Sequence, residues 1–219
     1  MRRFLIISLL TLMVTQGFPQ TKLRHISNTS LLQDGDLMFC LSGKPDAITD
    51  VSHGIDGMGI NHVAIFHKDN NGSYAIEAIH KGVCINPIDS FIKSNIVDEY
   101  NGQIIIGRIN RGSIDIPKSI HNALKYIGRP YDFYFEPGDS AIYCSELVQI
   151  SFVDRKGQLI FHTIPMSFHD KSGEITVFWK EYYSKAGMTV PEGVQGSNPG
   201  ELSREPKIKM LYIITHWGN

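Results

Sequence analysis

The chain has 219 residues, of which 42% are hydrophobic and 20% charged, so it is long enough to bury one substantial core. Its formal net charge is −1 at pH 7, and acidic and basic residues are interspersed without repeats or low-complexity tracts. This balance excludes the basic surface by which nucleic-acid-binding proteins hold phosphates, and we expect no nucleic-acid partner.

Residues 1–20 have the layout of a secretory signal peptide, with a positive start and a mostly apolar stretch over residues 4–14. That stretch is shorter than the roughly 20 apolar residues of a membrane helix, and no later segment of the mature chain is long and apolar enough to cross a bilayer. We expect cleavage within residues 17–20. The mature chain, residues 21–219, is then a single exported domain, periplasmic or extracellular.

The first half of the mature chain has the pattern of a series of strands. Apolar runs bounded by turn residues indicate β-structure, and residues 68–72 (Lys-Asp-Asn-Asn-Gly) form the clearest hairpin turn. The expected strands cover residues 36–41, 61–67, 73–79, 82–86, 103–109 and 209–215.

Helical patterns dominate the second half. A proline at residue 117 and an Asn-Pro pair at residues 198–199 are typical helix starts, and a glycine at residue 128 is a typical helix stop. Expected helices cover residues 47–52 as a single turn, 88–94, 117–127, 144 onward, 174–185 and 199 onward. Strands followed by helices predict an α+β fold with an antiparallel sheet packed against helices.

Cys144 stands where an irregular segment gives way to an apolar run with helical spacing. Residues 142–153 place aliphatic side chains on one face, and we expect Gln149, Asp154 and Arg155 to point outward. A cysteine in the first turn of a helix meets unpaired backbone N–H groups and the positive end of the helix dipole. Both favour the thiolate, the form that attacks a carbonyl. The alternative is that Cys144 is a small buried hydrophobic residue, as most free cysteines are.

The chain contains three cysteines, an odd number for an exported protein. Cys40 and Cys84 both lie on strand-like segments, so they can form a disulfide that leaves Cys144 free; three reduced thiols are equally compatible with the sequence. No Cys-x-x-Cys or Cys/His spacing typical of zinc is present, so we expect no metal and no cofactor.

His62 and Glu77 are the partners that a thiolate nucleophile at Cys144 requires. His62 begins an apolar strand, and Glu77 lies in another, where a carboxylate is unfavourable unless it is paired. If residues 69–72 form a four-residue hairpin loop, the two side chains share a face as diagonal neighbours. A three-residue loop would place them on opposite faces. The structural alternative for His62 is a hydrogen bond to backbone or water.

Four segments in this order resemble the YiiX/YaeF-like permuted papain-like cysteine hydrolases of the NlpC superfamily. They are Leu-Gln-Asp-Gly-Asp-Leu at 32–37, Asn-His-Val-Ala-Ile at 61–65, Ala-Ile-Glu-Ala at 75–78 and Tyr-Cys-Ser-Glu-Leu-Val at 143–148. The resemblance implies a circularly permuted papain-like fold, because the histidine strand precedes the cysteine helix.

The resemblance also implies the roles of individual residues. Cys144 corresponds to the nucleophile, His62 to the general base and acid, and Glu77 to the residue that orients the imidazole. The Cys144 N–H is an expected oxyanion donor. Tyr131 or Tyr134 is the candidate for the second donor, because related sites often use a tyrosine; ordinary aromatic packing is the alternative for each.

Two aspartates, Asp36 and Asp132, are further candidates for the pocket; the alternative for both is capping of backbone groups. The sequence therefore predicts an exported cysteine hydrolase that cleaves an amide or ester through a thioester acyl-enzyme. The resemblance implies a cell-wall peptide or a lipid-type acyl amide or ester as substrate. A non-catalytic module that binds a small molecule or lipid is the rival function, and a purely structural domain would bury Cys144 away from any cleft.

Overall fold

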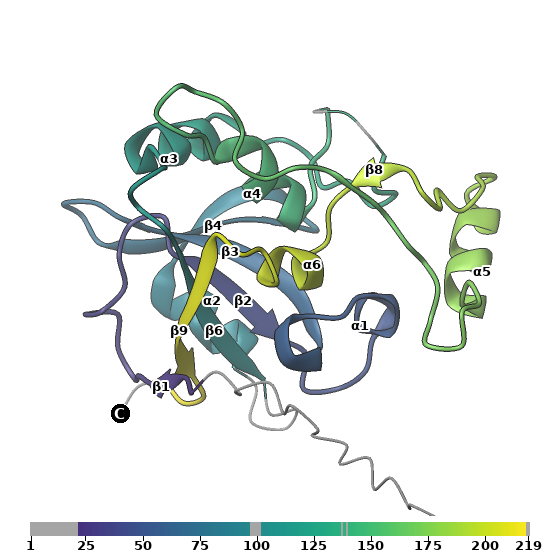
Figure 1. The fold of residues 1–219 in the computed structure, drawn as a ribbon, viewed down its shortest axis with the longest axis horizontal. Helices are drawn as coiled ribbons and strands as arrows, with labels where there is room; N and C mark the ends of the chain where they lie inside the picture. Colours follow the sequence, from purple (N-terminus) through teal and green to yellow (C-terminus); the bar gives the residue numbers. More distant parts are fainter. Residues whose placement is uncertain (1–21, 97–101, 137, 139, 218–219) are drawn as a thin grey trace, which may run out of the picture.

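The computed structural model describes residues 22–96, 102–136, 138 and 140–217, and the expected signal peptide lies outside them. A seven-stranded sheet with the order β1-β9-β6-β2-β3-β4-β5 forms the centre of the fold (Figure 1). The strands are β1 (Arg24–His25), β2 (Leu37–Leu41), β3 (Ile60–Lys68), β4 (Ser73–Ile79), β5 (Gly82–Pro87), β6 (Gln103–Ile109) and β9 (Ile208–Ile214).

Every neighbouring pair in this sheet is antiparallel except β1 and β9, which are parallel. The predicted α+β class with an antiparallel sheet is therefore confirmed. The short strand β1 was not predicted, because its two residues, Arg24 and His25, carry no apolar pattern and only their pairing with β9 makes them a strand.

Helices cover both faces of the sheet. They are α1 (Ala47–Val51), α2 (Ile88–Asn95), α3 (Ile116–Lys125), α4 (Cys144–Ser151), α5 (Val177–Lys185) and α6 (Pro199–Ser203), with a 3-10 turn at Ile55–Gly57. The alternation of side chains along β2 explains the two layers, because Leu37 and Phe39 belong to the hydrophobic cluster that includes α3 and α4. Met38 and Cys40 belong to the cluster that includes α2.

The β3–β4 hairpin has the register that its turn predicts. Lys68 pairs with Ser73 and Ile65 pairs with Ile76, so residues 69–72 form the loop. Asp69 stabilises this loop, since its Oδ1 accepts hydrogen bonds from the backbone N–H groups of Asn71 (2.8 Å) and Gly72 (3.0 Å). His62 and Glu77 therefore lie on the same face of the hairpin, as a contact between them requires.

A third hydrophobic cluster lies beyond the sheet, around α5 at the right of Figure 1. Its buried members are Met166, Phe168, Trp179 and Tyr183, and the small sheet of β7 (Ile164–Pro165) and β8 (Gln195–Gly196) borders it. We call this cluster, together with the residues packed against it from α1 and from residues 134–135, the aromatic wall. Of its backbone only α1 and α5 were predicted; β7 and β8 were not.

Candidate active site

Cys144 is the first residue of α4, and its side chain is buried. Glu146, in the first turn, turns back so that its Oε2 accepts a hydrogen bond from the backbone N–H of Tyr143 (3.3 Å), the residue that caps the helix. The N–H of Cys144 has no acceptor within the helix, because the first N–H groups of any helix lack one. The sulfur and a backbone donor are thus held together at one helix end.

The prediction that Gln149 points outward is wrong, since its side chain is buried. Helix α4 is covered by the sheet on one side and by α3 and α6 on others, so the amphipathic pattern does not mark a solvent face. Asp154 and Arg155, also expected on that outer face, follow the end of the helix at Ser151.

His62 and Glu77 meet as the hairpin register predicts. His62 Nε2 donates a hydrogen bond to Glu77 Oε2 over 2.7 Å, and only 5% of the Glu77 side chain is exposed. The sulfur of Cys144 lies close enough to the same ring to raise the pKa of His62 through hydrogen bonding and charge. Because Glu77 occupies Nε2, Nδ1 is the ring nitrogen that remains for the sulfur. The structure therefore brings Cys144, His62 and Glu77 together in one chain of polar contacts.

The pKa of His62 shows that the imidazole ring carries a proton in this series of contacts. Burial works against a charged ring, but the hydrogen bonds to Cys144 and Glu77 and the negative charges of both groups outweigh it and raise the pKa of His62 to about 10. The ring is therefore an imidazolium at neutral pH.

Asn86 on β5 completes the surroundings of Glu77, and sequence reasoning missed it. Its Nδ2 donates to Glu77 Oε1 over 2.8 Å, so each carboxylate oxygen of Glu77 has its own donor. The pairing of Glu77 with Cys84 puts Asn86, two residues further along β5, on the same face. This position of Asn86 could have been predicted from the sequence, because a two-residue turn at residues 80–81 gives this register of β4 and β5.

The other two thiols differ from Cys144 in their surroundings. Burial and the nearby charge of Glu77 raise the pKa of both Cys40 and Cys84, so both remain protonated at neutral pH. All three cysteines are free. The Cys40–Cys84 disulfide, one of the two predicted arrangements, is excluded because β3 and β4 lie between their strands, a spacing of about 14 Å that no disulfide spans.

Tyr131 borders the pocket at Cys144, whereas Tyr134 does not. Backbone hydrogen bonds from Ile142 N–H to the carbonyl of Pro130 (2.9 Å) and from Asp132 N–H to the carbonyl of Ile142 (3.4 Å) fix the position of Tyr131. Burial, followed by the negative charge of Cys144, raises the pKa of the Tyr131 phenol. Its hydroxyl therefore keeps its proton and can donate it in a hydrogen bond.

Tyr134 packs in the aromatic wall, with its ring centroid 5.6 Å from that of Tyr182 and 6.2 Å from that of Tyr183. The structure thus separates two tyrosines that the sequence left equivalent.

The two aspartates have structural contacts. Asp36 is fully buried and forms an ion pair with Arg108, whose Nε and Nη2 donate to its two oxygens over 2.7 and 2.6 Å. It directly precedes β2, four residues before Cys40, the residue opposite His62, and it does not border the pocket. Asp132 Oδ1 accepts from the N–H of Tyr134 over 2.8 Å, and burial raises the pKa of its carboxyl group.

The pocket at Cys144 is apolar and narrow, with a volume of about 70 Å³. None of its lining residues is Asp, Glu, Lys, Arg or His. They are Ile48, Val51, Ser52, Asn61, Tyr131, Phe135, Tyr143, Cys144, Ser145, Met166, Ser167, Phe168, Trp179, Ser197, Asn198 and Pro199. Helix α1, residues 131–135, the start of α4 and the aromatic wall therefore enclose the sulfur. His62 is not among the lining residues, although its chain neighbour Asn61 is.

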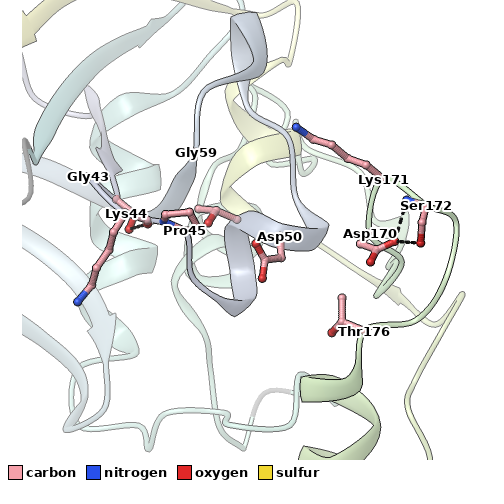
Figure 2. Close-up of a pocket in the computed structure, with 11 residues that line it drawn as sticks. Gly43, Lys44, Pro45, Asp50, Gly59, Asp170, Lys171, Ser172 and Thr176 are labelled. Atoms are coloured by element: carbon pink, nitrogen blue, oxygen red, sulfur yellow. Dashed lines mark hydrogen bonds between the residues drawn. The ribbon is translucent and has the colours of Figure 1, made fainter.

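A second cavity, of about 700 Å³, is polar and open (Figure 2). Lys44 and Asp50 border it from the α1 region, and Asp170, Lys171 and Ser172 from the turn before α5. The carboxylate of Asp170 accepts hydrogen bonds from the N–H and hydroxyl of Ser172, which hold this turn. The cavity contains no cysteine or histidine, so size alone does not identify the reactive site.

Comparison with known proteins identifies the family of this chain. The model of the family described as permuted papain-like amidase enzyme, YaeF/YiiX, C92 family, matches residues 31–212. The chain belongs to this family. The uncharacterized protein YiiX of Escherichia coli strain K12 is 26% identical over 158 residues, which cover 70% of this chain and 74% of that protein. The predicted YiiX-like permuted papain-like family is thereby confirmed.

A solved structure shows the same fold. The crystal structure of metalloprotein yiiX from Escherichia coli O157:H7 matches with a TM-score of 0.63 and 22% identity, covering 85% of this chain and 98% of that one. Within the part of the chain that the structure describes, no three His, Cys, Asp or Glu side chains are grouped as a metal ion requires. No helix among the described residues has the length and apolar character needed to span a membrane.

Proposed function

We propose that the protein is a cysteine hydrolase that cleaves an amide or ester by way of a thioester acyl-enzyme. The observation that carries the proposal is the chain of contacts from the Cys144 sulfur through His62 to Glu77. A buried carboxylate that orients an imidazolium beside a cysteine at a helix start is the arrangement that nucleophilic catalysis by a thiol requires. The membership of a family of amidases supports the same reaction class.

The reaction follows from the positions of these groups. The Cys144 thiolate attacks the carbonyl carbon, and the negative charge moves to the carbonyl oxygen. The N–H of Cys144 and the hydroxyl of Tyr131 donate hydrogen bonds to that oxygen. As the tetrahedral intermediate collapses, the bond to the leaving group breaks and His62 gives its proton to the departing nitrogen or oxygen. Neutral His62 then takes a proton from water, the resulting hydroxide attacks the thioester, and Cys144 is released.

The pocket favours an apolar acyl group. The leaving group must face His62, which protonates it, and we place the acyl group in the apolar pocket at Cys144, which His62 does not line. Since none of the lining residues has an ionisable acid or base except Cys144 and two tyrosines, a charged acyl group there would be buried without a partner. We therefore propose an acyl amide or ester of lipid type in preference to a cell-wall peptide with a charged acyl side chain.

The proposed location is outside the cytoplasm. Residues 1–20 have the pattern of a secretory signal peptide. An exported hydrolase would meet acyl lipids at the outer surface of the inner membrane or beyond it. N-terminal sequencing of the secreted protein tests this, and a mature chain that begins with Met1 would contradict it.

The test of the reaction compares labelling with turnover. Iodoacetamide should alkylate Cys144 rapidly near neutral pH, and the His62→Ala variant should react at least 100-fold more slowly. N-butyryl-4-nitroanilide and N-succinyl-4-nitroanilide have four-carbon acyl groups of similar size, one apolar and one with a terminal carboxylate. The butyryl compound should react faster, and Cys144→Ala should abolish turnover of both. Rapid labelling without any hydrolysis would support the rival binding function, and slow labelling would exclude a reactive thiol.

A further inference from the structure

Glu77 makes two contacts that differ in chemistry. Its Oε2 accepts from the imidazolium of His62 over 2.7 Å, and its Oε1 accepts from the neutral amide of Asn86 over 2.8 Å. Glu77 is 4% exposed, so water offers little replacement for either donor. A carboxylate on a flexible side chain held at only one oxygen can turn about its last bonds. The second contact removes that freedom.

Asn86 has a fixed position relative to Glu77. On β4 and β5, Glu77 pairs with Cys84 and Ala75 pairs with Asn86. The register is secured at its turn by Gly82, which has a φ of +100°, and a Cβ there would lie 2.4 Å from the carbonyl oxygen of Arg129. The next residue, Val83, exchanges two backbone hydrogen bonds with the Gly128–Arg129 turn, each 2.8 Å long. Strand β5, at the edge of the sheet, is therefore hydrogen-bonded both to β4 and to the Gly128–Arg129 turn. These bonds fix the register of Asn86 relative to Glu77.

The chemistry of the carboxylate sets the orientation of the Asn86 amide. An ionised carboxylate only accepts hydrogen bonds, so the nitrogen of Asn86 and not its oxygen must face Glu77. The same Nδ2 also lies 3.3 Å from the sulfur of Cys84, a much weaker acceptor. The bond to Glu77 is charge-assisted and is the stronger of the two.

On the basis of the proposed function, we propose that Asn86 is a positioning residue of the catalytic site, the fourth member of the series Cys144, His62, Glu77 and Asn86. It acts through Glu77 and does not touch the substrate. By donating to Oε1 it holds Oε2 on the His62 ring, which keeps the imidazole in the tautomer and orientation that present Nδ1 to the sulfur. The raised pKa of His62 depends on the same contact with Glu77.

The test uses variants of similar size that differ in the donor. Asn86→Leu keeps the volume without a donor, and Asn86→Gln keeps a donor on a longer side chain. We expect Asn86→Leu to lower kcat for N-butyryl-4-nitroanilide about tenfold with little change in KM, the loss expected for a hydrogen bond to a charged group. The upper pH limit of kcat/KM should fall by about one unit, because His62 loses its proton at lower pH. Asn86→Gln should recover part of both quantities.

Cys84→Ala is the matched control, because it removes the other contact of Asn86 and keeps both hydrogen bonds of Glu77. It should keep kcat and the pH profile of the wild-type protein. A pH limit in Asn86→Leu equal to that of the wild type would overturn the proposal, even if kcat fell, since a merely structural loss does not move the titration of His62. If the wild-type protein shows no pH-dependent labelling of Cys144, the hydrolase proposal itself fails, and this inference fails with it.

Discussion

The site has two sides that are built in different ways. On one side, His62 and Glu77 lie on adjacent strands of one hairpin, and the hairpin register alone brings them to 2.7 Å. On the other side, the pocket wall is assembled from α1, residues 131–135, Met166, Phe168 and Trp179, which are far apart in the chain. The first side depends on local pairing, and the second depends on tertiary packing.

A single buried contact shows how the two sides are joined. The Tyr143 hydroxyl, next to Cys144 in the chain, accepts a hydrogen bond from the backbone N–H of Ser197 over 2.9 Å. Ser197 follows β8, at the border of the aromatic wall. Under the proposed function, the sheet side carries the proton chemistry, while the wall shapes the pocket and stabilises it. Each prediction below tests that division.

The largest effect is expected for the tyrosine that stands where the two sides meet. Tyr131→Phe removes the proposed second oxyanion donor and should lower kcat roughly 100-fold, within the usual range for such a donor. Tyr134→Phe, in the same loop, should change kcat less than about twofold, because Tyr134 packs in the wall. Steady-state kinetics of the two variants decide this. Equal losses in both would mean that the loop, and not one hydroxyl, supports the reaction.

The next effect concerns the charge on the sheet side. Glu77→Gln preserves the shape of the contact, because the amide of Asn86 can turn round and accept a hydrogen bond from the new amide. Only the negative charge is lost, and kcat/KM should fall about 50-fold, as expected for a charged hydrogen bond.

The pH profile of Glu77→Gln gives the sign of that effect. Cys144 and Glu77 together raise the pKa of His62 from its ordinary value of 6.5 to about 10, and the charge of Glu77 is one part of that rise. Without the charge, activity should be lost at a lower pH than in the wild-type protein. A profile of kcat/KM from pH 5 to 11 measures the shift. An upper limit that stays in place would show that Glu77 does not set the protonation of His62.

The difference between local pairing and tertiary packing also explains which features can be predicted from the sequence. The loop at residues 69–72 determines which residues of β3 and β4 share a face. The contact between His62 and Glu77 can therefore be predicted by counting residues along both strands from this loop. The helix start at Cys144 follows from the change to an apolar pattern with helical spacing. Asn198 caps α6 with Pro199 in its first turn, as their pairing predicts. These features are encoded over a few neighbouring residues.

Other features depend on which elements become neighbours, and no local pattern contains that information. The sequence allows a Cys40–Cys84 disulfide because it does not show that two strands separate β2 from β5. The helical periodicity predicts an outward-facing Gln149 because it carries no information about the packing of α3 and α6 on α4. Tyr131 and Tyr134 differ only in tertiary surroundings. Asn86 is an exception among the features that the sequence analysis did not predict. The register argument applied to β3 and β4 places it on the face of Glu77 when it is extended to β5.

The smallest effect is expected in the wall. Trp179 is 3% exposed, and its indole Nε1 donates to the carbonyl oxygen of Ala47 over 3.1 Å, which attaches α5 to α1. Trp179→Phe keeps an aromatic ring but leaves that carbonyl without its donor, and the free energy of unfolding should fall by about 1.5 kcal/mol. Urea denaturation measures the change, and the rate of Cys144 alkylation by iodoacetamide provides the contrast. That rate should match the wild type, because the groups that act on the sulfur, His62 and the start of α4, lie outside the wall. A parallel fall in both quantities would show that the wall also orients the catalytic groups, and the two sides would then have to be treated as one unit.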